Sequence, residues 1–244
     1  MAQPKNHINQ LLFLAAGEGK RLKHETANKP KPLVGVADKT LLDHALDTVR
    51  DFATFDELIL VVRYLGEQIA KHVEQYDFPV TIREQERLGG TAHAVQTAVD
   101  DLEPDNSVLV VFPDSICRVH PDHELDQTAA ASVFCFHTPE IRRYGEAATD
   151  EQGRIIAITE KPANPVSDLA LSEFTYFSQA RTLIRYLDHY FQNDPRSKNG
   201  EAYLAEVLDN MVQAGERVVA AELLSRYDCG TLEALAQTRA ELKA

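Results

Sequence analysis

The chain has 244 residues, of which 44% are hydrophobic and 26% are charged, and its formal net charge is −13. This length fits one large α/β domain or two small ones, with enough apolar residues for a substantial core. The acidity argues against nucleic acid and an anionic membrane surface as partners, because both need a broad basic face, but it leaves room for one nucleotide in a locally basic pocket.

Strand-like apolar runs alternate with helix-like stretches through the first half of the chain. The predicted strands cover residues 10–15, 57–62, 80–83, 107–112 and 131–136. Apolar residues at a spacing of three and four predict helices over 41–52, around 69–73 and over 94–102. Repeated strand–helix units of this kind predict an α/β fold with a three-layer, doubly wound, mostly parallel sheet that is Rossmann-like.

The second half is more mixed. Residues 154–160 and 170–178 are predicted strands, and helices are predicted over 180–191, 203–214 and 232–242. A polar loop at 193–200 is the best candidate for a mobile lid. Because no linker or repeat interrupts the chain, we predict one compact domain over residues 1–244.

The cysteine pattern and the apolar runs bear on the compartment. Cys117, Cys135 and Cys229 have no paired spacing, which is typical of a reduced, cytoplasmic protein. The first apolar run, residues 11–16, is shorter than a signal-peptide core and leads directly into a glycine loop, so we interpret it as a first strand.

That glycine loop carries the strongest local signal in the sequence. The first predicted strand ends at Gly17-Glu18-Gly19, and residues 20–31 then hold five lysines and arginines against one acid, Glu25. Glycines let the backbone approach phosphates, and cations neutralise their charge. Prolines on both sides of Lys31 stiffen its segment. The loop therefore predicts a site for a polyanion such as a nucleoside triphosphate, the alternative being a plain turn.

Two common phosphate-binding motifs do not explain this loop. A Walker A motif needs a glycine where Leu14 stands and a serine or threonine where Arg21 stands. A dinucleotide fingerprint needs a third glycine, and Leu22 occupies that position.

A longer series of motifs, in order along nearly the whole chain, resembles the sugar-phosphate nucleotidyltransferase family. The matching segments are Leu14-Ala15-Ala16-Gly17-x-Gly19-x-Arg21-Leu22, Pro30-Lys31-Pro32-Leu33, Gln85 with Gly90-Thr91-Ala92, Asp114, Tyr144-Gly145, Glu160-Lys161-Pro162, Gly200-Glu201 and Asp228-Cys229-Gly230-Thr231. The resemblance implies a glycosyltransferase-A-like fold, with a nucleotide-binding lobe over 1–140 and a sugar-phosphate-binding lobe over 141–244.

The resemblance also implies an activity. Members transfer a nucleotidyl group from a nucleoside triphosphate to a sugar 1-phosphate and release pyrophosphate with Mg²⁺ bound. By resemblance, Arg21 stabilises the triphosphate and the departing pyrophosphate, and Lys31 serves the reacting phosphates. Asp114 and Asp228 hold the metal, consistent with the preference of Mg²⁺ for a few carboxylates together with phosphate oxygens and water. Taken singly, each aspartate also fits an ordinary turn.

The remaining family positions divide between the two substrates. The nucleotide is expected to contact Leu14, Ala15, Ala16, Gly17, Gly19, Gln85, Gly90 and Thr91. Gln85 faces the base by resemblance, and an amide that both donates and accepts suits uracil or thymine, which favours UTP or dTTP. The sugar phosphate is expected to contact Gly145, Glu160, Lys161 and Glu173.

Glu173 departs from the family pattern, because many members have a glycine near this position. A glutamate there can attract a cationic acceptor, so a cytidylyltransferase that acts on phosphocholine is an alternative. A catalytically silent homologue that binds nucleotide sugars is another. Such a protein is expected to lack one of Arg21, Lys31, Asp114 or Asp228, and all four are present.

Overall fold

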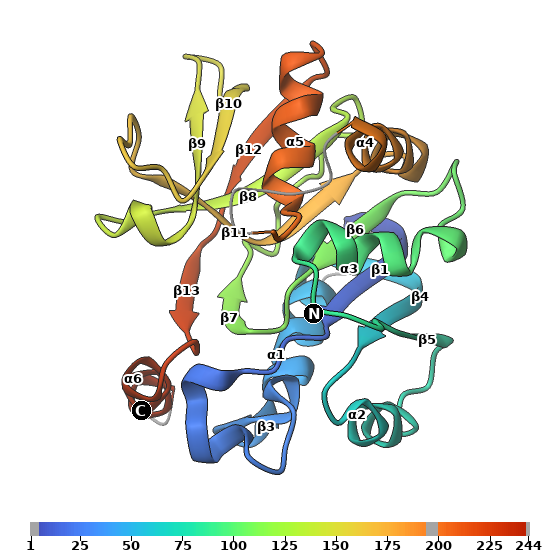
Figure 1. Cartoon of the computed structure of the whole chain (residues 1–244), viewed down its shortest axis with the longest axis vertical. Coiled ribbons are helices and arrows are strands. Elements are labelled where there is room, and N and C mark those ends of the chain that lie inside the picture. Colours follow the sequence, from blue (N-terminus) through green and yellow to red (C-terminus); the bar gives the residue numbers. More distant parts are fainter. Residues whose placement is uncertain (1–4, 194–199, 243–244) are drawn as a thin grey trace.

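The computed structural model describes residues 5–193 and 200–242, and its centre is a nine-stranded mixed sheet (Figure 1). Seven strands follow one another in the order β10-β9-β11-β6-β1-β4-β5, and β8 and β12 extend from β11. The strands of this sheet are β1 (Asn6–Ala15), β4 (Ala53–Val62), β5 (Val80–Glu84), β6 (Val108–Val111), β8 (Ala131–His137), β9 (Gly145–Thr149), β10 (Ile155–Glu160), β11 (Leu169–Phe177) and β12 (Val218–Glu222).

The first half of the chain builds the parallel part of the sheet. β1 pairs in parallel with β4 on one side and β6 on the other, and β4 pairs in parallel with β5. The chain first moves outward from β1 and then returns to its opposite side. Ligands of doubly wound sheets bind beside such a reversal, at the carboxyl ends of the strands.

The second half adds the antiparallel strands. β11 pairs antiparallel with β6, β8 and β9, and β9 pairs antiparallel with β10. β12 returns to parallel pairing with β8. The predicted mostly parallel α/β fold is confirmed, and its antiparallel strands are confined to the region that the sequence pattern leaves mixed.

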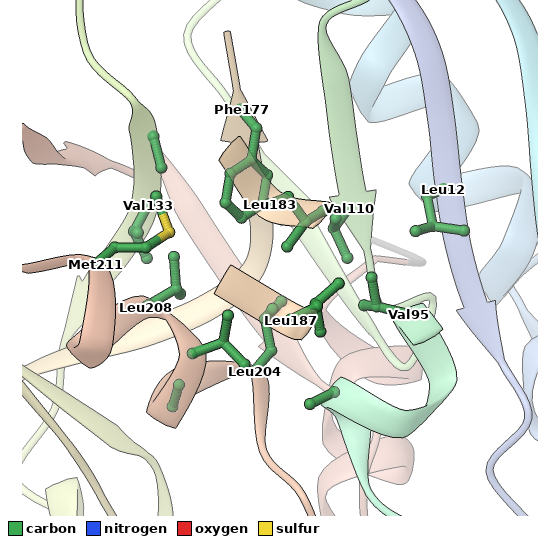
Figure 2. Close-up of a cluster of buried hydrophobic side chains, with 14 of the residues drawn as sticks. Leu12, Val95, Val110, Val133, Phe177, Leu183, Leu187, Leu204, Leu208 and Met211 are labelled. Atoms are coloured by element: carbon green, nitrogen blue, oxygen red, sulfur yellow. The ribbon is translucent and has the colours of Figure 1, made fainter. Parts of the chain in front are cut away.

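Side chains that alternate along the strands divide the core into two layers. On β1, Leu12 and Leu14 contribute to one buried cluster, and Leu11 and Phe13 contribute to the other. Helices α3 (Thr91–Thr97), α4 (Ala180–Asn193) and α5 (Leu204–Gln213) cover the first face, where Figure 2 shows Leu183, Leu187, Leu204, Leu208 and Met211 packed together. Helices α1 (Leu41–Phe52) and α2 (Gly66–Val73) cover the second.

Two small sheets and a last helix lie beside this three-layer body. β2 (Gly35–Val36) pairs with β3 (Lys39–Thr40), and β7 (Ser115–Arg118) pairs with β13 (Ser225–Asp228). β13 leads into α6 (Leu232–Glu241) beside the main sheet (Figure 1). Leu235 of α6 packs in a third cluster with Leu22, Val34 and Cys229. Short 3₁₀ segments occupy Lys20–Thr26, Lys31–Leu33, Val99–Asp101 and Ile141–Arg143.

The predicted strands and helices are present, and their ends differ from the sequence-based bounds by a few residues. The helix predicted over 94–102 is the clearest difference, because α3 begins at Thr91 and ends at Thr97 and a 3₁₀ turn follows. Ala98 leaves helical backbone angles at φ −112° and ψ 10°. Residues 194–199, most of the predicted lid, lie outside the described part of the chain. In the described part, no helix has the length and apolarity needed to span a membrane.

Candidate functional site

The carboxyl ends of the parallel strands carry the predicted nucleotide-binding residues. The loops after β1, β5 and β6 border a cavity of about 500 Å³. Its lining includes Leu14, Ala15, Ala16, Gly17, Gly19, Arg21, Lys31, Gln85, Gly90, Thr91 and Asp114. Every residue that the sequence assigns to the nucleotide therefore lines one cavity.

A second cavity of about 650 Å³ adjoins the first and contains the other predicted residues. Its lining includes Gly145, Glu160, Lys161, Glu173 and Asp228. Arg21, Asp114 and Gly230 border both cavities, together with Thr91, Phe112 and Tyr203. Groups bound in the two cavities would therefore lie next to each other, beside the guanidinium of Arg21 and the carboxylate of Asp114.

Lys31 is held rigidly at the first cavity. Its side chain is only 10% exposed, and its Nζ lies 3.2 Å from Asp114 Oδ2. The turn that presents it depends on Gly19, which has φ +63° and whose missing Cβ would lie 3.0 Å from Lys31 Cβ. A larger residue at position 19 would strain the backbone and press on this lysine.

Arg21 and Asp228 both lie against Gly230, at the place where a side chain would begin. A Cβ at Gly230 would be 3.3 Å from Arg21 Nη2 and 3.0 Å from Asp228 Oδ1. The Gly230 N–H donates to Asp228 Oδ1 at 2.8 Å, and Arg143 Nη2 lies 3.7 Å from Asp228 Oδ2. The bond from the Gly230 N–H orients the Asp228 carboxylate, and the absence of a side chain at Gly230 leaves room for the guanidinium of Arg21.

Asp114 and Asp228 provide donors that fit a divalent cation. Both carboxylates line the second cavity, and both are hard oxygen ligands. Over residues 5–193 and 200–242, no three His, Cys, Asp or Glu side chains cluster closely enough to hold a metal ion. Two carboxylates are the usual protein contribution where Mg²⁺ also binds substrate phosphates.

Gln85 is buried in the wall of the first cavity, with 2% of its surface exposed. Its backbone N–H donates to Val62 O at 2.8 Å, and its Nε2 lies 2.9 Å from His93 Nδ1. The alternative to a binding role was an exposed side chain in a polar stretch. The burial of Gln85 excludes that alternative.

Gly90 joins the nucleotide loop to the segment before α5. It has φ +89°, and a Cβ there would lie 2.3 Å from the Ala202 carbonyl oxygen. Ala202 N donates to Gly89 O at 2.7 Å, and Ala92 N donates to Ala202 O at 2.8 Å. Leu204 N donates to Thr91 Oγ1 at 2.8 Å. We call these three bonds the 89–204 seam.

The wall of the second cavity places Lys161 under strain. Lys161 has φ +46°, a left-handed conformation that is uncommon for a residue with a side chain. Its Nζ lies 3.2 Å from Glu160 Oε1 and 4.6 Å from the centre of the Tyr203 ring. Burial raises the pKa of Glu160, and Lys161 opposes that shift. Gly145 leaves room for Glu160, because a Cβ there would be 3.2 Å from Glu160 Oε2.

Glu173 was expected to contact the acceptor, but in the structure its carboxylate is already bonded to Arg226. Its Oε1 and Oε2 accept from Arg226 Nε at 2.9 and 3.0 Å, and both side chains are at least 90% buried. Arg226 also donates to Ser115 Oγ at 2.9 Å and stacks over Phe136. The negative charge of Glu173 is therefore neutralised by protein, which removes the reason to expect a cationic acceptor such as phosphocholine.

Sequence reasoning missed three side chains of the second cavity, namely Arg143, Tyr203 and Arg226. Arg226 precedes Asp228 by two positions on β13, so strand alternation puts both on one face. The shared face of Arg226 and Asp228 could be predicted only if residues 225–228 were recognised as a strand. Arg143 precedes Tyr144-Gly145, and Tyr203 is the residue before α5.

Comparison with known proteins agrees with the geometry. The family model described as nucleotidyl transferase matches residues 11–244. The UTP–glucose-1-phosphate uridylyltransferase AglF of Haloferax volcanii is 32% identical over 215 residues, which cover 86% of each chain. The bifunctional protein GlmU of Methanocaldococcus jannaschii is 29% identical over 202 residues, which cover 83% of this chain and 46% of that protein.

Solved structures share the fold. A UDP-glucose pyrophosphorylase in complex with UDP-glucose superposes with a TM-score of 0.83 at 20% identity and covers 97% of this chain and 98% of its own. A putative glucose-1-phosphate thymidylyltransferase from Bacillus anthracis superposes with a TM-score of 0.76 at 21% identity, over 96% of this chain and 94% of its own. With a family model matched over almost its whole length, the chain belongs to the nucleotidyl transferase family.

Proposed function

We propose that this protein transfers the nucleoside monophosphate of UTP or dTTP to a sugar 1-phosphate and releases pyrophosphate. The observation that carries the proposal is the shared border of the two cavities, where Arg21 and Asp114 face both. One cavity has the glycine loop that suits a triphosphate, and the other has Glu160 and Lys161, which suit a phosphorylated polyol. The uridylyltransferase activity of the relative AglF supports the same choice.

The reaction needs positioning more than covalent help from the protein. An ionised oxygen of the sugar phosphate attacks the α-phosphorus, a new O–P bond forms, and the bond to the β-phosphate oxygen breaks with its electron pair on pyrophosphate. The attacking oxygen is already deprotonated, so no general base is required. Arg21 and Lys31 would stabilise the charge that builds on the phosphates, and Lys161 would hold the acceptor phosphate.

A divalent cation completes the charge balance in this proposal. Asp114 and Asp228 would hold Mg²⁺, which when bound neutralises phosphate oxygens and helps to orient them. Lys31 restrains Asp114, and the Gly230 N–H restrains Asp228, so both carboxylates are oriented by the protein itself.

The acceptor is proposed to be neutral or anionic. Glu160 would accept hydrogen bonds from sugar hydroxyls beside Gly145. Glu173 supports Arg226 in the wall instead of contacting the acceptor directly, because its two oxygens already accept from that guanidinium.

Pyrophosphate release tests the proposal directly. UTP, dTTP, CTP, GTP and ATP are each combined with a panel of sugar 1-phosphates and with phosphocholine, with and without Mg²⁺. We expect release with UTP or dTTP and a sugar 1-phosphate only when Mg²⁺ is present. Release with phosphocholine alone would contradict the proposed acceptor, and silence with bound nucleotide would contradict an enzymatic role with these acceptors.

Variants of the two carboxylates test the metal assignment. Asp114→Asn and Asp228→Asn are expected to raise the Mg²⁺ concentration needed for half-maximal rate at least several-fold. Asp38→Asn, which changes an exposed acid outside both cavities, is the matched control. An unchanged Mg²⁺ titration in either cavity variant would remove that residue from the metal site.

A further inference from the structure

Arg226 of β13 is the most deeply buried of the described cations that line the second cavity. Its side chain is 10% exposed, whereas Arg21, Arg143 and Lys161 are exposed residues. The proposed reaction gives Arg21 and Lys161 roles at the phosphates and gives Arg226 none. The donors of this buried guanidinium therefore need an account of their own.

The protein uses the N–H donors of Nε and Nη2 in Arg226 and leaves those of Nη1. Nε donates to the two oxygens of Glu173 at 2.9 and 3.0 Å, and Nη2 donates to Glu173 Oε1 and, at 2.9 Å, to Ser115 Oγ. The Glu173 side chain is 8% exposed, and its Oε2 also accepts from Cys117 Sγ at 3.2 Å. Because a guanidinium only donates, these bonds leave no doubt about which atom is the donor.

Nη1 of Arg226 borders open space. In the described part of the chain, no residue accepts a hydrogen bond from it. The fully buried side-chain atoms without a partner, over those same residues, are Arg63 Nε, Gln96 Oε1 and Ser132 Oγ, and Nη1 is not among them. It is therefore accessible, and the space that Arg226 lines is the second cavity. Two unpartnered N–H donors face that cavity from a side chain that is nine-tenths buried.

The guanidinium is held on its face as well as along its bonded edge. Its Cζ lies 4.6 Å from the centre of the Phe136 ring and 5.2 Å from the centre of the Tyr144 ring. The two rings meet edge to face, with centroids 5.1 Å apart and planes at 85°. Because Glu173 and the rings fix the group, the Nη1 donors have a set direction before a ligand arrives, and a ligand there needs little further ordering of the protein.

The charge balance of the cavity favours a neutral partner for Nη1. Its described lining has as many cations as carboxylates, namely Arg21, Arg143, Lys161 and Arg226 with Asp114, Glu160, Glu173 and Asp228. The acceptor phosphate already adds negative charge to this set, and Glu173 already neutralises Arg226. A second carboxylate at Nη1 would be desolvated without a cation of its own, whereas a hydroxyl oxygen gains a bond to a charged donor without that cost.

We propose that Arg226 Nη1 donates a hydrogen bond to a hydroxyl oxygen of the acceptor sugar and thereby selects acceptors that carry this hydroxyl. The inference rests on the proposed function, because that function assigns the second cavity to the sugar 1-phosphate. It adds a residue that discriminates between acceptors, and it makes Glu173 the positioning residue that aims the donor.

Deoxy analogues combined with a variant of Arg226 test this contact. Calorimetry gives dissociation constants for the sugar 1-phosphate that the wild type binds most tightly and for its monodeoxy analogues, with nucleotide present and Mg²⁺ absent. We expect the wild type to bind one deoxy analogue at least about tenfold more weakly than the parent, as for a lost hydrogen bond to a charged group. In Arg226→Lys the ammonium pairs with Glu173 and offers no fixed second donor, so the rejection of that analogue should disappear while the other analogues keep their factors.

The lysine variant separates binding from support of the fold. A residue needed only to neutralise Glu173 is replaced well by lysine, so a purely structural role would leave the rejection of every analogue unchanged. Arg217→Lys is the matched control, because Arg217 pairs with Asp126 outside both cavities, and it should keep every factor. If Arg226→Lys does not fold, Arg226→Met combined with Glu173→Leu removes both charges of the pair together and provides the same comparison.

The two proposals can fail separately. A protein that rejects a deoxy analogue through Arg226 but transfers nothing would contradict the proposed function and support the role of Arg226. A protein that transfers a nucleotide, while the wild type and Arg226→Lys reject every analogue by equal factors, would overturn the role of Arg226 alone. So would tighter binding of the corresponding uronic acid 1-phosphate that is lost in Arg226→Lys, because a carboxylate would then be the partner of Nη1.

Discussion

At the scale of single residues, the charged groups of the two cavities are arranged in opposite pairs. Four of the cations that border the cavities lie within 4 Å of a carboxylate, so that each of these charges has an opposite partner in the protein. The pairs are Lys31 with Asp114, Arg143 with Asp228, Lys161 with Glu160, and Arg226 with Glu173. Such pairing orients the groups before a polyanion binds, which is the condition for electrostatic catalysis.

Lys31→Ala tests the importance of one such group. We expect the turnover number to fall by about 10²–10³-fold, as for other preorganised charge-stabilising groups. The midpoint of thermal unfolding should change little, because Asp114 is 47% exposed and water can replace the lost ammonium group. The exposed Lys29→Ala in the same segment is the control. Turnover close to that of the wild type would remove Lys31 from the mechanism.

Gly90→Ala tests the seam at its tightest point. The new methyl would lie 2.3 Å from a backbone oxygen at a backbone angle that alanine rarely adopts. We expect a loss of about 2 kcal/mol or more in unfolding free energy and weaker nucleotide binding. Gly153→Ala is the control, because φ is +75° but no atom lies within 4 Å, so only about 1 kcal/mol of backbone strain is expected. Equal losses in urea unfolding would show that contact with Ala202 is unimportant.

At the scale of secondary-structure elements, α6 connects the glycine-loop region to the strand that carries Asp228. Arg239 donates to Glu25 Oε1 at 2.6 Å and to Gly35 O at 2.8 Å. Thr238 Oγ1 donates to Asp228 O at 2.8 Å, and Thr231 caps the helix through Ala234 N. One short helix thereby fixes segments that are about 200 residues apart in the chain.

Arg239→Ala is expected to destabilise the protein by about 2 kcal/mol at pH 7 and to lower kcat/KM, because both segments carry site residues. Hydrogen bonds from Arg239 lower the pKa of Glu25 below its usual 4.5. The stability from this pair is therefore complete above pH 4.5 and is lost as the pH falls through the lowered pKa. The gap between wild type and variant in thermal unfolding should narrow in acid, and a gap of constant size would contradict the assignment.

Elements with a regular apolar period could be predicted from the sequence, and those defined by tertiary pairing could not. The runs at β1, β4 and β6 are buried on both faces and therefore stand out as continuous apolar segments. β13 has the sequence Ser225-Arg226-Tyr227-Asp228, in which no apolar alternation is visible. It is a strand because β7 lies beside it, and that neighbour comes from a part of the chain more than 100 residues away.

At the scale of the whole molecule, several ionisable groups make the fold sensitive to acid. The hydrogen bond from Thr128, together with Arg217, lowers the pKa of Asp126 to about 2. Burial lowers the pKa of His93 and His123 below 6.5. In each case the unfolded chain binds the proton more readily, so stability falls as the pH decreases. Burial raises the pKa of Glu160, which acts in the opposite direction.

We therefore expect the midpoint of thermal unfolding to decline modestly below pH 6.5 and more steeply between pH 4 and pH 2, the range set by the usual and lowered pKa of Asp126. Asp126→Asn should reduce the second decline, to which Glu25 also contributes, and leave the first unchanged. Calorimetry from pH 2 to pH 8 provides the measurement. A midpoint that stays constant from pH 4 to pH 2 would show that Asp126 is not held ionised by its partners.

The location of the candidate site residues was more predictable than the contacts that support them. Residues such as Lys31 and Asp114 lie in motifs whose order along the chain is informative, and the fold brings these motifs to one edge of the sheet. The role of Glu173 depended on Arg226, which lies 53 positions later, and no local pattern indicates that pair. Pairings of this kind depend on the register of distant strands.

The 89–204 seam couples the wall of the first cavity to the wall of the second. If a nucleotide restrains residues 89–92, as proposed, it also restrains Ala202 and Leu204, because three hydrogen bonds join the two segments. The second ligand then binds segments that the first has already ordered, so its binding loses less conformational entropy. By linkage, if bound nucleotide raises the affinity for the acceptor by some factor, bound acceptor raises the affinity for the nucleotide by the same factor.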